Sequence, residues 1–219
     1  MISMKTLDDA LDQSFIDLEI SPKQQGSIMN YLNLIKQKSE RTWGHCVRVG
    51  LTGKEVANFT HTINPKALYY PGLLHDVGKV LTNSDSLEKT QNFDERDKKE
   101  LSRHPADSYR LLRGIHDFSA EVALRHHSFQ GERSYPKQLP KSDLTFSRAT
   151  NSMIDYCARL IGLIDFYDAA TYRKNDNFSI GDSKLLTDRE VKVELIKENK
   201  DQSCLINKLY EVGIFGRAN

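Results

Sequence analysis

The stretch Gly72-Leu-Leu-His-Asp-Val-Gly-Lys79 ends an apolar run with an imidazole and a carboxylate, and an ammonium group follows one helical turn later. Imidazole nitrogens suit Fe, Mn and Zn ions, and a carboxylate can bridge two of them. On a continued helix, Lys79 would project from the same side as His75 and Asp76. A cation there would repel metal ions unless an anion were also bound, which favours a phosphate-binding role. The alternative is an ordinary lysine that complements the helix macrodipole.

Residues with metal-binding side chains also occur on both sides of this stretch: His45, His104, His126, His127 and Asp165. These four histidines lie beside apolar residues on predicted helices, whereas His61 and His116 lie in polar connections and are left out. Asp165 falls on or beside an apolar stripe, where an ionised carboxylate must pair, protonate or bind a cation. A buried Asp–Arg pair or a helix cap is the alternative. Asp168, one turn later, is predicted to support a ligand, with the cap of a turn as the alternative. Zinc-finger and zincin spacings are missing from the sequence.

The composition is typical of a globular protein. Its 219 residues suit one large domain, alone or with a small appendage. The 31 basic and 30 acidic residues give a net charge of +1, so no overall field favours a nucleic acid polymer or a membrane. The 3 cysteines are odd in number and widely spaced, which indicates a reducing compartment. No stretch approaches the ~20 apolar residues of a membrane span, and the N-terminus lacks the order of a signal peptide. We expect a cytoplasmic location.

Helical periodicity dominates, so an all-α fold is expected. Ser21-Pro22-Lys23-Gln24 and Thr187-Asp-Arg-Glu190 each fit a capping box at a helix start. Asn64-Pro65 is predicted to begin a helix that runs through the His-Asp pair, and Ser119 to cap a helix that carries His126 and His127. The other predicted helices cover residues 7–15, 22–38, 43–58, 97–103, 105–113, 150–172 and 204–212. Residues 82–96 and 131–143 are predicted loops, and 175–185 is the clearest linker.

The order of these side chains resembles the HD superfamily of metal-dependent phosphohydrolases, and more closely its HD-GYP branch of cyclic dinucleotide phosphodiesterases. The segments that carry the resemblance are Leu73-Leu-His-Asp-Val-Gly-Lys79, His104-Pro105 with Leu111-Leu112, Ala123–His127, and Ile164-Asp-Phe-Tyr-Asp-Ala-Ala-Thr171 with Arg173. Together they span about residues 41 to 176. The resemblance implies one HD-type helical domain over residues 41–219, built around a binuclear metal site. Residues 1–40 are then a helical extension packed on that domain.

The resemblance also implies a set of ligands for two divalent ions, most often Fe or Mn, with Mg, Zn and Ni as alternatives. One ion would be held by His45, His75, Asp76 and Asp165, and the other by His104, His126, His127 and Asp76. Asp76 would bridge the two. Family members with a third metal have a glutamate about one turn before the first histidine. Here that position is Arg41, so two ions are expected and not three.

The chain departs from the HD-GYP pattern after the paired histidines, on the substrate side of the pocket. HD-GYP proteins usually read His-His-Glu, then Asp-Gly, then Gly-Tyr-Pro. This chain reads His126-His127-Ser128, then Gln130-Gly131 and Ser134-Tyr135-Pro136, so the acid after the paired histidines and the glycine of the Gly-Tyr-Pro motif are replaced. Cyclic di-GMP is the leading substrate. Tyr135 would pack against a guanine or anchor the loop. Arg173 and Lys174 would clamp a second phosphate, with a solvated helix end as the equal alternative.

The mechanism expected from this resemblance is hydrolysis by a hydroxide that bridges the two ions, with Asp76 and Lys79 as catalytic residues. Lys79 would neutralise charge that develops on the phosphate oxygens. Two alternatives remain. One is an HD hydrolase for another small nucleotide, such as a monophosphate, (p)ppGpp or a different cyclic dinucleotide. The other is a non-catalytic signalling module. The presence of all seven ligand residues argues against this alternative.

Overall fold

The computed structural model describes residues 4–129, 134–137, 139, 145–172, 179–180 and 184–216. Its longer helices are α1 (Met4–Asp17), α2 (Pro22–Lys38), α3 (Glu40–Thr60), α4 (Lys66–Leu74), α7 (His104–Leu112), α8 (Asp117–Arg125), α9 (Arg148–Tyr172), α10 (Asp188–Glu198) and α11 (Ser203–Glu211). The shorter ones are η1 (Val77–Leu81), α5 (Ser84–Glu88), α6 (Glu95–Leu101) and η3 (Lys200–Gln202). Strands β1 (Ser179–Ile180) and β2 (Lys184–Leu185) pair as a small antiparallel hairpin. The all-α class is confirmed.

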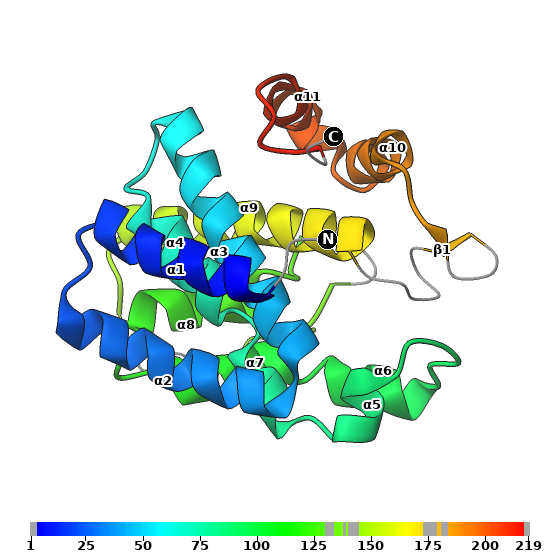
Figure 1. Cartoon of the computed structure of the whole chain (residues 1–219), viewed down its shortest axis with the longest axis horizontal. Coiled ribbons are helices and arrows are strands. Elements are labelled where there is room, and N and C mark those ends of the chain that lie inside the picture. Colours follow the sequence, from blue (N-terminus) through cyan, green and yellow to red (C-terminus); the bar gives the residue numbers. More distant parts are fainter. Residues whose placement is uncertain are drawn as a thin grey trace.

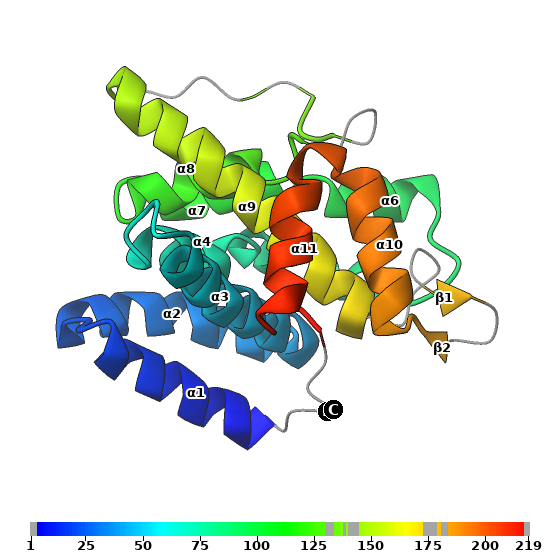
Figure 2. The same ribbon diagram turned by 90° about the horizontal axis from the view of Figure 1, so that it is seen from above.

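Helices α3 and α9 form the middle of the molecule, with α2 on one side and α10 and α11 on the other (Figure 1). Helix α3 packs against α1, α2, α4 and α9, while α9 also packs against α4, α8 and α10. The α5–α6 segment and the β1–β2 hairpin lie at the same end of the molecule, as the view from above also shows (Figure 2). Residues far apart in the sequence therefore meet where α3 and α9 cross the ends of α4, α7 and α8.

The buried apolar side chains form two clusters. One joins α9 to the C-terminal helices through Ile161, Val191 and Ile206. The other joins α1 and α2 to α3 and α4, for example through Leu32 and Trp43. Side chains from residues 1–40 thus share a core with the following helices, but their assignment to a separate extension stays a prediction.

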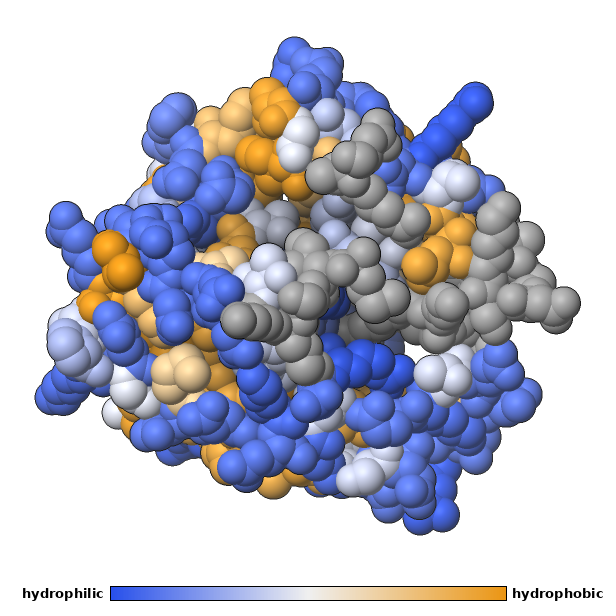
Figure 3. Space-filling view, in the orientation of Figure 1, coloured by the Kyte–Doolittle hydropathy of each residue, from blue (hydrophilic) through white to orange (hydrophobic). Residues whose placement is uncertain are grey.

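The molecular surface is mostly hydrophilic in the view of Figure 3, with apolar residues in separate small patches. The exposed large apolar side chains belong to different helices, such as Ile16 on α1, Leu34 on α2 and Val193 on α10. Scattered apolar residues of this kind are normal on a soluble surface and do not by themselves mark a docking site. None of the helices within the described residues combines the length and apolar character needed to cross a bilayer.

Both predicted capping boxes are present. Ser21 and Gln24 exchange hydrogen bonds at the start of α2, and Thr187 and Glu190 do the same at the start of α10. Each side chain satisfies a backbone N–H that the first helical turn leaves without a partner. Local sequence therefore sets these two helix starts.

Several elements differ from the prediction. Helix α4 ends at Leu74, before the His-Asp pair, and the backbone continues through Asp76 (φ −100°, ψ 9°) into a 3₁₀ turn. Helix α8 begins at Asp117 with His116 as its N-cap, so Ser119 is a buried helical residue and not the cap. The predicted loop over 82–96 contains α5. Helix α5 is only five residues long, which is too short for apolar periodicity to reveal.

Helices α3 and α4 approach closely because glycines face each other at their crossing. A Cβ atom added at Gly72 would lie 2.7 Å from the Cα of Gly50, which real side chains do not tolerate. This close approach brings His45 on α3 and His75, the residue after α4, into ring contact, with centroids 5.2 Å apart.

Candidate metal centre

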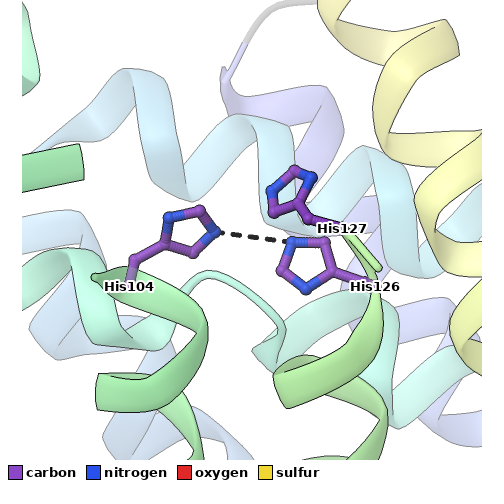
Figure 4. A group of neighbouring side chains, drawn as sticks. All are labelled: His104, His126 and His127. Atoms are coloured by element: carbon purple, nitrogen blue, oxygen red, sulfur yellow. Dashed lines mark hydrogen bonds between the residues drawn. The ribbon is translucent and has the colours of Figure 1, made fainter. Parts of the chain in front are cut away.

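The structure brings all seven predicted metal-binding side chains into one buried cluster. Three groups of donor atoms lie within 4.8 Å of one another: His45 with His75 and Asp76; His104 with His126 and His127; and His75 with His126 and Asp165. The first two groups divide the histidines as the predicted ligand sets do. Figure 4 shows the second group, in which the three rings point toward one another.

Three of the histidines stand at helix ends. His75 directly follows α4, His126 directly follows α8, and His104 opens α7 just after α6 has ended. In each, Nδ1 donates to the backbone carbonyl three residues earlier: His75 to Gly72 (2.8 Å), His104 to Leu101 (2.7 Å) and His126 to Ala123 (2.6 Å). These carbonyls belong to the last turns of α4, α6 and α8, where the helix itself leaves acceptors unused.

Those hydrogen bonds fix the tautomer of the three rings. A carbonyl can only accept, so Nδ1 must carry the proton, and Nε2 of a neutral ring then keeps its lone pair. Each Nε2 points away from the helix end and into the cluster. The arrangement prepares three imidazoles as donors to a cation without help from any other side chain.

His45 is oriented differently, because it lies inside α3. Its Nδ1 donates to Asp168 Oδ2 over 2.7 Å, and its Nε2 lies 3.0 Å from Asp165 Oδ1. Asp168 also accepts hydrogen bonds from Arg48 Nε and Nη2, over 2.6 and 2.9 Å. The predicted supporting position of Asp168 agrees with these contacts.

Asp76 lies between the two groups of histidines. Its Oδ2 is 3.5 Å from Nε2 of both His45 and His75, while its Oδ1 is 3.0 Å from Nε2 of His104. One carboxylate thus presents one oxygen to each group, which is the arrangement that a bridging ligand requires. Lys79 Nζ contacts Asp76 Oδ2 at 2.5 Å. Lys79 reaches that side through the 3₁₀ turn and not through a continued α4.

Two imidazole nitrogens of the cluster lie close to each other. Nε2 of His104 and Nε2 of His126 lie 3.4 Å apart, along the dashed line in Figure 4. Both rings already donate through Nδ1, so a hydrogen bond between the two Nε2 atoms requires one ring to be a protonated imidazolium. Burial lowers the pKa of His126 to about 3, so that ring is neutral near pH 7. A cation between two lone pairs accounts for the approach equally well.

The two acids of the cluster are ionised at neutral pH. Burial by itself raises the pKa of Asp76, but Lys79, His75 and His104 together lower it well below the usual 3.8. The pKa of Asp165 is also held well below 3.8, because the hydrogen bond and charge of His45 outweigh the effect of burial. In addition, the buried Nε2 of His75 has no hydrogen-bond partner among the described residues. The donor set and this orphaned atom fit divalent metal ions.

Acid is expected to destabilise the metal-free protein. In the folded chain burial lowers the pKa of His75 to about 4 and that of His126 to about 3, against 6.5 in the unfolded chain. The unfolded chain therefore binds more protons below pH 6.5, so stability is full above that value and falls as the pH drops toward 4. The lowered pKa values of Asp76 and Asp165 act with the same sign below pH 3.8.

The measurement is the thermal midpoint of the chelated protein between pH 7.5 and pH 4.5. A variant with both His75→Gln and His126→Gln should show a shallower decline over the same range, since glutamine binds no proton. His116 remains in both proteins and contributes a decline of the same sign, because burial lowers its pKa also. A midpoint that does not change between pH 7 and pH 5 would contradict the expectation.

The residues predicted to face the substrate are only partly within the described chain. The ring of Tyr135 stacks on His127 with centroids 4.3 Å apart and also meets the edge of His104. This contact suits the anchoring role, and packing against a guanine stays a prediction. Arg173 and Lys174 lie outside the described residues. Arg41 is directed to α5, where it donates to the carbonyl of Leu87.

Three small residues of the site were not recognised in the sequence. A Cβ atom at Gly78 would lie 2.3 Å from the carbonyl oxygen of His104, and one at Gly162 would lie 2.3 Å from that of His126. Ser108 donates to the carbonyl of His75 over 2.7 Å and accepts from the amide of Gly78. A glycine inside the strongly helical pattern of α9 was the available signal, since it usually has a packing reason.

Comparison with known proteins relates this site to others. A family model described as HD domain matches residues 42–170, which include all seven cluster residues. The chain is 29% identical over 143 residues to 3′3′-cGAMP-specific phosphodiesterase 1 of Vibrio cholerae, covering 64% of this chain and 31% of that protein. It is 24% identical over 160 residues to 3′3′-cGAMP-specific phosphodiesterase 2 of the same organism, covering 70% of this chain and 28% of that protein. The chain thus spans less than a third of either relative.

Proposed function

Because the chain belongs to the HD domain family, we propose that it is a metal-dependent phosphodiesterase that hydrolyses a cyclic dinucleotide. The observation that carries this proposal is the position of Asp76, whose two oxygens face the two groups of imidazoles. A carboxylate placed in this way can hold two ions close enough to act on one phosphate. The names of both Vibrio cholerae relatives support a cyclic dinucleotide as the substrate.

The predicted ligand sets are retained in the proposal. One ion would be held by His45, His75, Asp76 and Asp165, and the other by His104, His126, His127 and Asp76. Fe and Mn are the proposed ions, since mixed imidazole and carboxylate donors suit them. When bound, two such ions lower the pKa of water toward neutrality and offset negative charge on phosphate oxygens.

The helix ends contribute to the binding of cations. The C-terminal end of a helix carries partial negative charge from its unused carbonyls. Helices α4, α6 and α8 all end at the cluster, and their last turns hold the rings of His75, His104 and His126. The same carbonyls that fix the tautomers thus add to a negative potential that attracts divalent ions.

Lys79 would act on the substrate phosphate. Its side chain is 11% exposed and its ammonium group lies beside the shared carboxylate, so it is held at the centre of the cluster. An ammonium group fixed in a largely dry site stabilises charge that develops on phosphate oxygens without reorganisation of solvent. Tyr135, next to His104 and His127, would stack on a base, and Arg173 and Lys174 would bind the second phosphate.

The substrate within this class is the finer part of the proposal. Cyclic di-GMP is the substrate expected from the sequence pattern, and the names of the two relatives add 3′3′-cGAMP. Both molecules have two phosphodiester groups and at least one guanine, so both suit a site with cations for phosphate and an aromatic ring for a base. The altered residues Ser128 and Ser134 lie where the pattern departs from HD-GYP proteins, and they would influence the choice.

The test is a hydrolysis panel with protein loaded anaerobically with Fe²⁺ or with Mn²⁺. The panel contains 3′3′-cGAMP, cyclic di-GMP, cyclic di-AMP, (p)ppGpp and nucleoside monophosphates. We expect two ions per chain by elemental analysis, and conversion of a guanine-containing cyclic dinucleotide to its linear form. Cleavage of only a monophosphate or of (p)ppGpp would replace the substrate class. Binding of a cyclic dinucleotide without turnover under both metals would indicate a non-catalytic module.

A further inference from the structure

The orienting partner of His45 distinguishes it from the three histidines at helix ends. His45 lies within α3, whose carbonyls accept hydrogen bonds from amides four residues later. No unused carbonyl of the helix end is available to its Nδ1. The partner comes instead from α9, where Asp168 is separated from His45 by 123 positions. His45 therefore depends on tertiary structure for its tautomer.

Asp168 is itself held in one orientation. Its Oδ1 accepts from Arg48 Nε, while its Oδ2 accepts from both Arg48 Nη2 and His45 Nδ1. A two-pronged contact of this kind fixes the rotation of the carboxylate as well as its position. Arg48 is on α3, three residues after His45, so one helix supplies both the ring and the group that locks its partner. The guanidinium of Arg48 also lies 4.5 Å from the centroid of the Tyr172 ring.

The contacts of Asp168 use its two oxygens as acceptors. Its side chain is only 4% exposed, and three N–H groups of Arg48 and His45 are directed at these oxygens. Because Nδ1 of His45 donates to Asp168, the ring takes the tautomer in which Nε2 has the lone pair.

We propose that Arg48 and Asp168 are positioning residues that hold His45 as a donor to one of the two metal ions. This proposal rests on the proposed function, because it takes His45 as a ligand. Arg48 fixes Asp168, Asp168 fixes the ring of His45, and the ring directs Nε2 toward Asp165 and Asp76. The other ion depends on His104, His126 and His127, of which the first two are oriented by backbone carbonyls. Loss of the Arg48–Asp168 contact should therefore weaken one ion selectively.

The first test is Asp168→Asn. An amide offers one acceptor oxygen to the three N–H donors that face Asp168, so at least one bond is lost and both tautomers of His45 become populated. We expect the affinity for one Mn²⁺ ion to fall by about 10- to 100-fold, while the other is retained. Calorimetric titration with Mn²⁺ measures both affinities. Long-range ¹H–¹⁵N NMR of the chelated full chain reports which nitrogen of His45 carries the proton.

A second pair of variants separates positioning from a structural role. Arg48→Gln removes both the positive charge and the two-pronged hydrogen bonding of the guanidinium, whereas Arg48→Lys keeps only the charge. We expect Arg48→Gln to weaken the same ion as Asp168→Asn does, and Arg48→Lys to restore part of its affinity. Lys54→Gln is the matched control, because Lys54 is also on α3 and makes an ion pair with Asp17, whose side chain is 44% exposed. That control should lower the thermal midpoint and leave the ratio of the two Mn²⁺ affinities unchanged.

The outcomes distinguish this proposal from the proposed function. If the unmodified chain binds no Mn²⁺, the metal-dependent function fails, while the NMR comparison still decides whether Asp168 sets the tautomer of His45. If the unmodified chain binds two ions and Asp168→Asn and Arg48→Gln do so with unchanged affinities, the positioning role is wrong and the function stands. Equal weakening of both ions in the two variants would also overturn the proposal, since it would indicate a general loss of structure.

Discussion

Asp76→Ala is expected to remove both proposed metal ions and to lower the rate of the proposed phosphodiester hydrolysis by more than ~10³-fold. Asp76 is the one described side chain that presents an oxygen to His104 and another to His45 and His75. Its loss would therefore take a ligand from each ion at once. Elemental analysis of the purified variant and a rate with the preferred cyclic dinucleotide measure the two effects.

The same substitution also lowers the stability of the fold, and this effect must be separated from the effect on metal binding. Lys79 is only 11% exposed and pairs with Asp76, so alanine would leave a buried ammonium group without its partner. Breaking a buried pair in this way typically costs about 3–5 kcal/mol. The double variant Asp76→Ala/Lys79→Met should recover part of that loss and still bind no metal. If Asp76→Ala kept two ions and its rate, the assignment of the shared ligand would be wrong.

Gly78→Ala is expected to destabilise the fold and to weaken metal binding together. The added Cβ atom would lie 2.3 Å from the carbonyl oxygen of His104 and 2.5 Å from the amide nitrogen of Ser108. Both are backbone atoms of α7, so the helix itself must move, and His104 moves with it. Overpacking of this kind costs about 1–3 kcal/mol, occasionally more. Urea denaturation and Mn²⁺ titration of the variant measure the two results.

Gly26→Ala is the matched control for that substitution. Gly26 is an exposed residue inside α2, and an added Cβ atom would meet nothing within 4 Å. Alanine is a better helix former than glycine by roughly 1 kcal/mol, so this variant should be slightly more stable with its metal binding unchanged. Equal effects of the two substitutions would show that the close approach of Gly78 to α7 has no importance for the site.

The features that sequence could predict are those set by neighbouring residues. The capping boxes at Ser21 and Thr187 involve groups three residues apart, and both are present. The order of histidines and acids predicted one buried cluster, and the structure brings those side chains together. The extension of α4 through His75 was wrong, because the apolar pattern continues where the backbone tightens into a 3₁₀ turn.

The features that escaped prediction depend on contacts between distant segments. Arg48 is an ordinary helical arginine until α9 places Asp168 beside it. Gly78 and Gly162 matter because other backbones lie against them, and no local pattern records which ones.

The histidines also differ in when, during synthesis of the chain, the group that orients each ring becomes available. His104, His126 and His127 all precede residue 128. Two of these rings, those of His104 and His126, donate hydrogen bonds to backbone carbonyls only three positions earlier. The hydrogen-bond partner that orients His45 is Asp168, which the ribosome adds more than a hundred residues later. During synthesis the hydrogen bonds that orient His104 and His126 thus need no residue of α9, whereas the one that orients His45 forms only after α9 has docked.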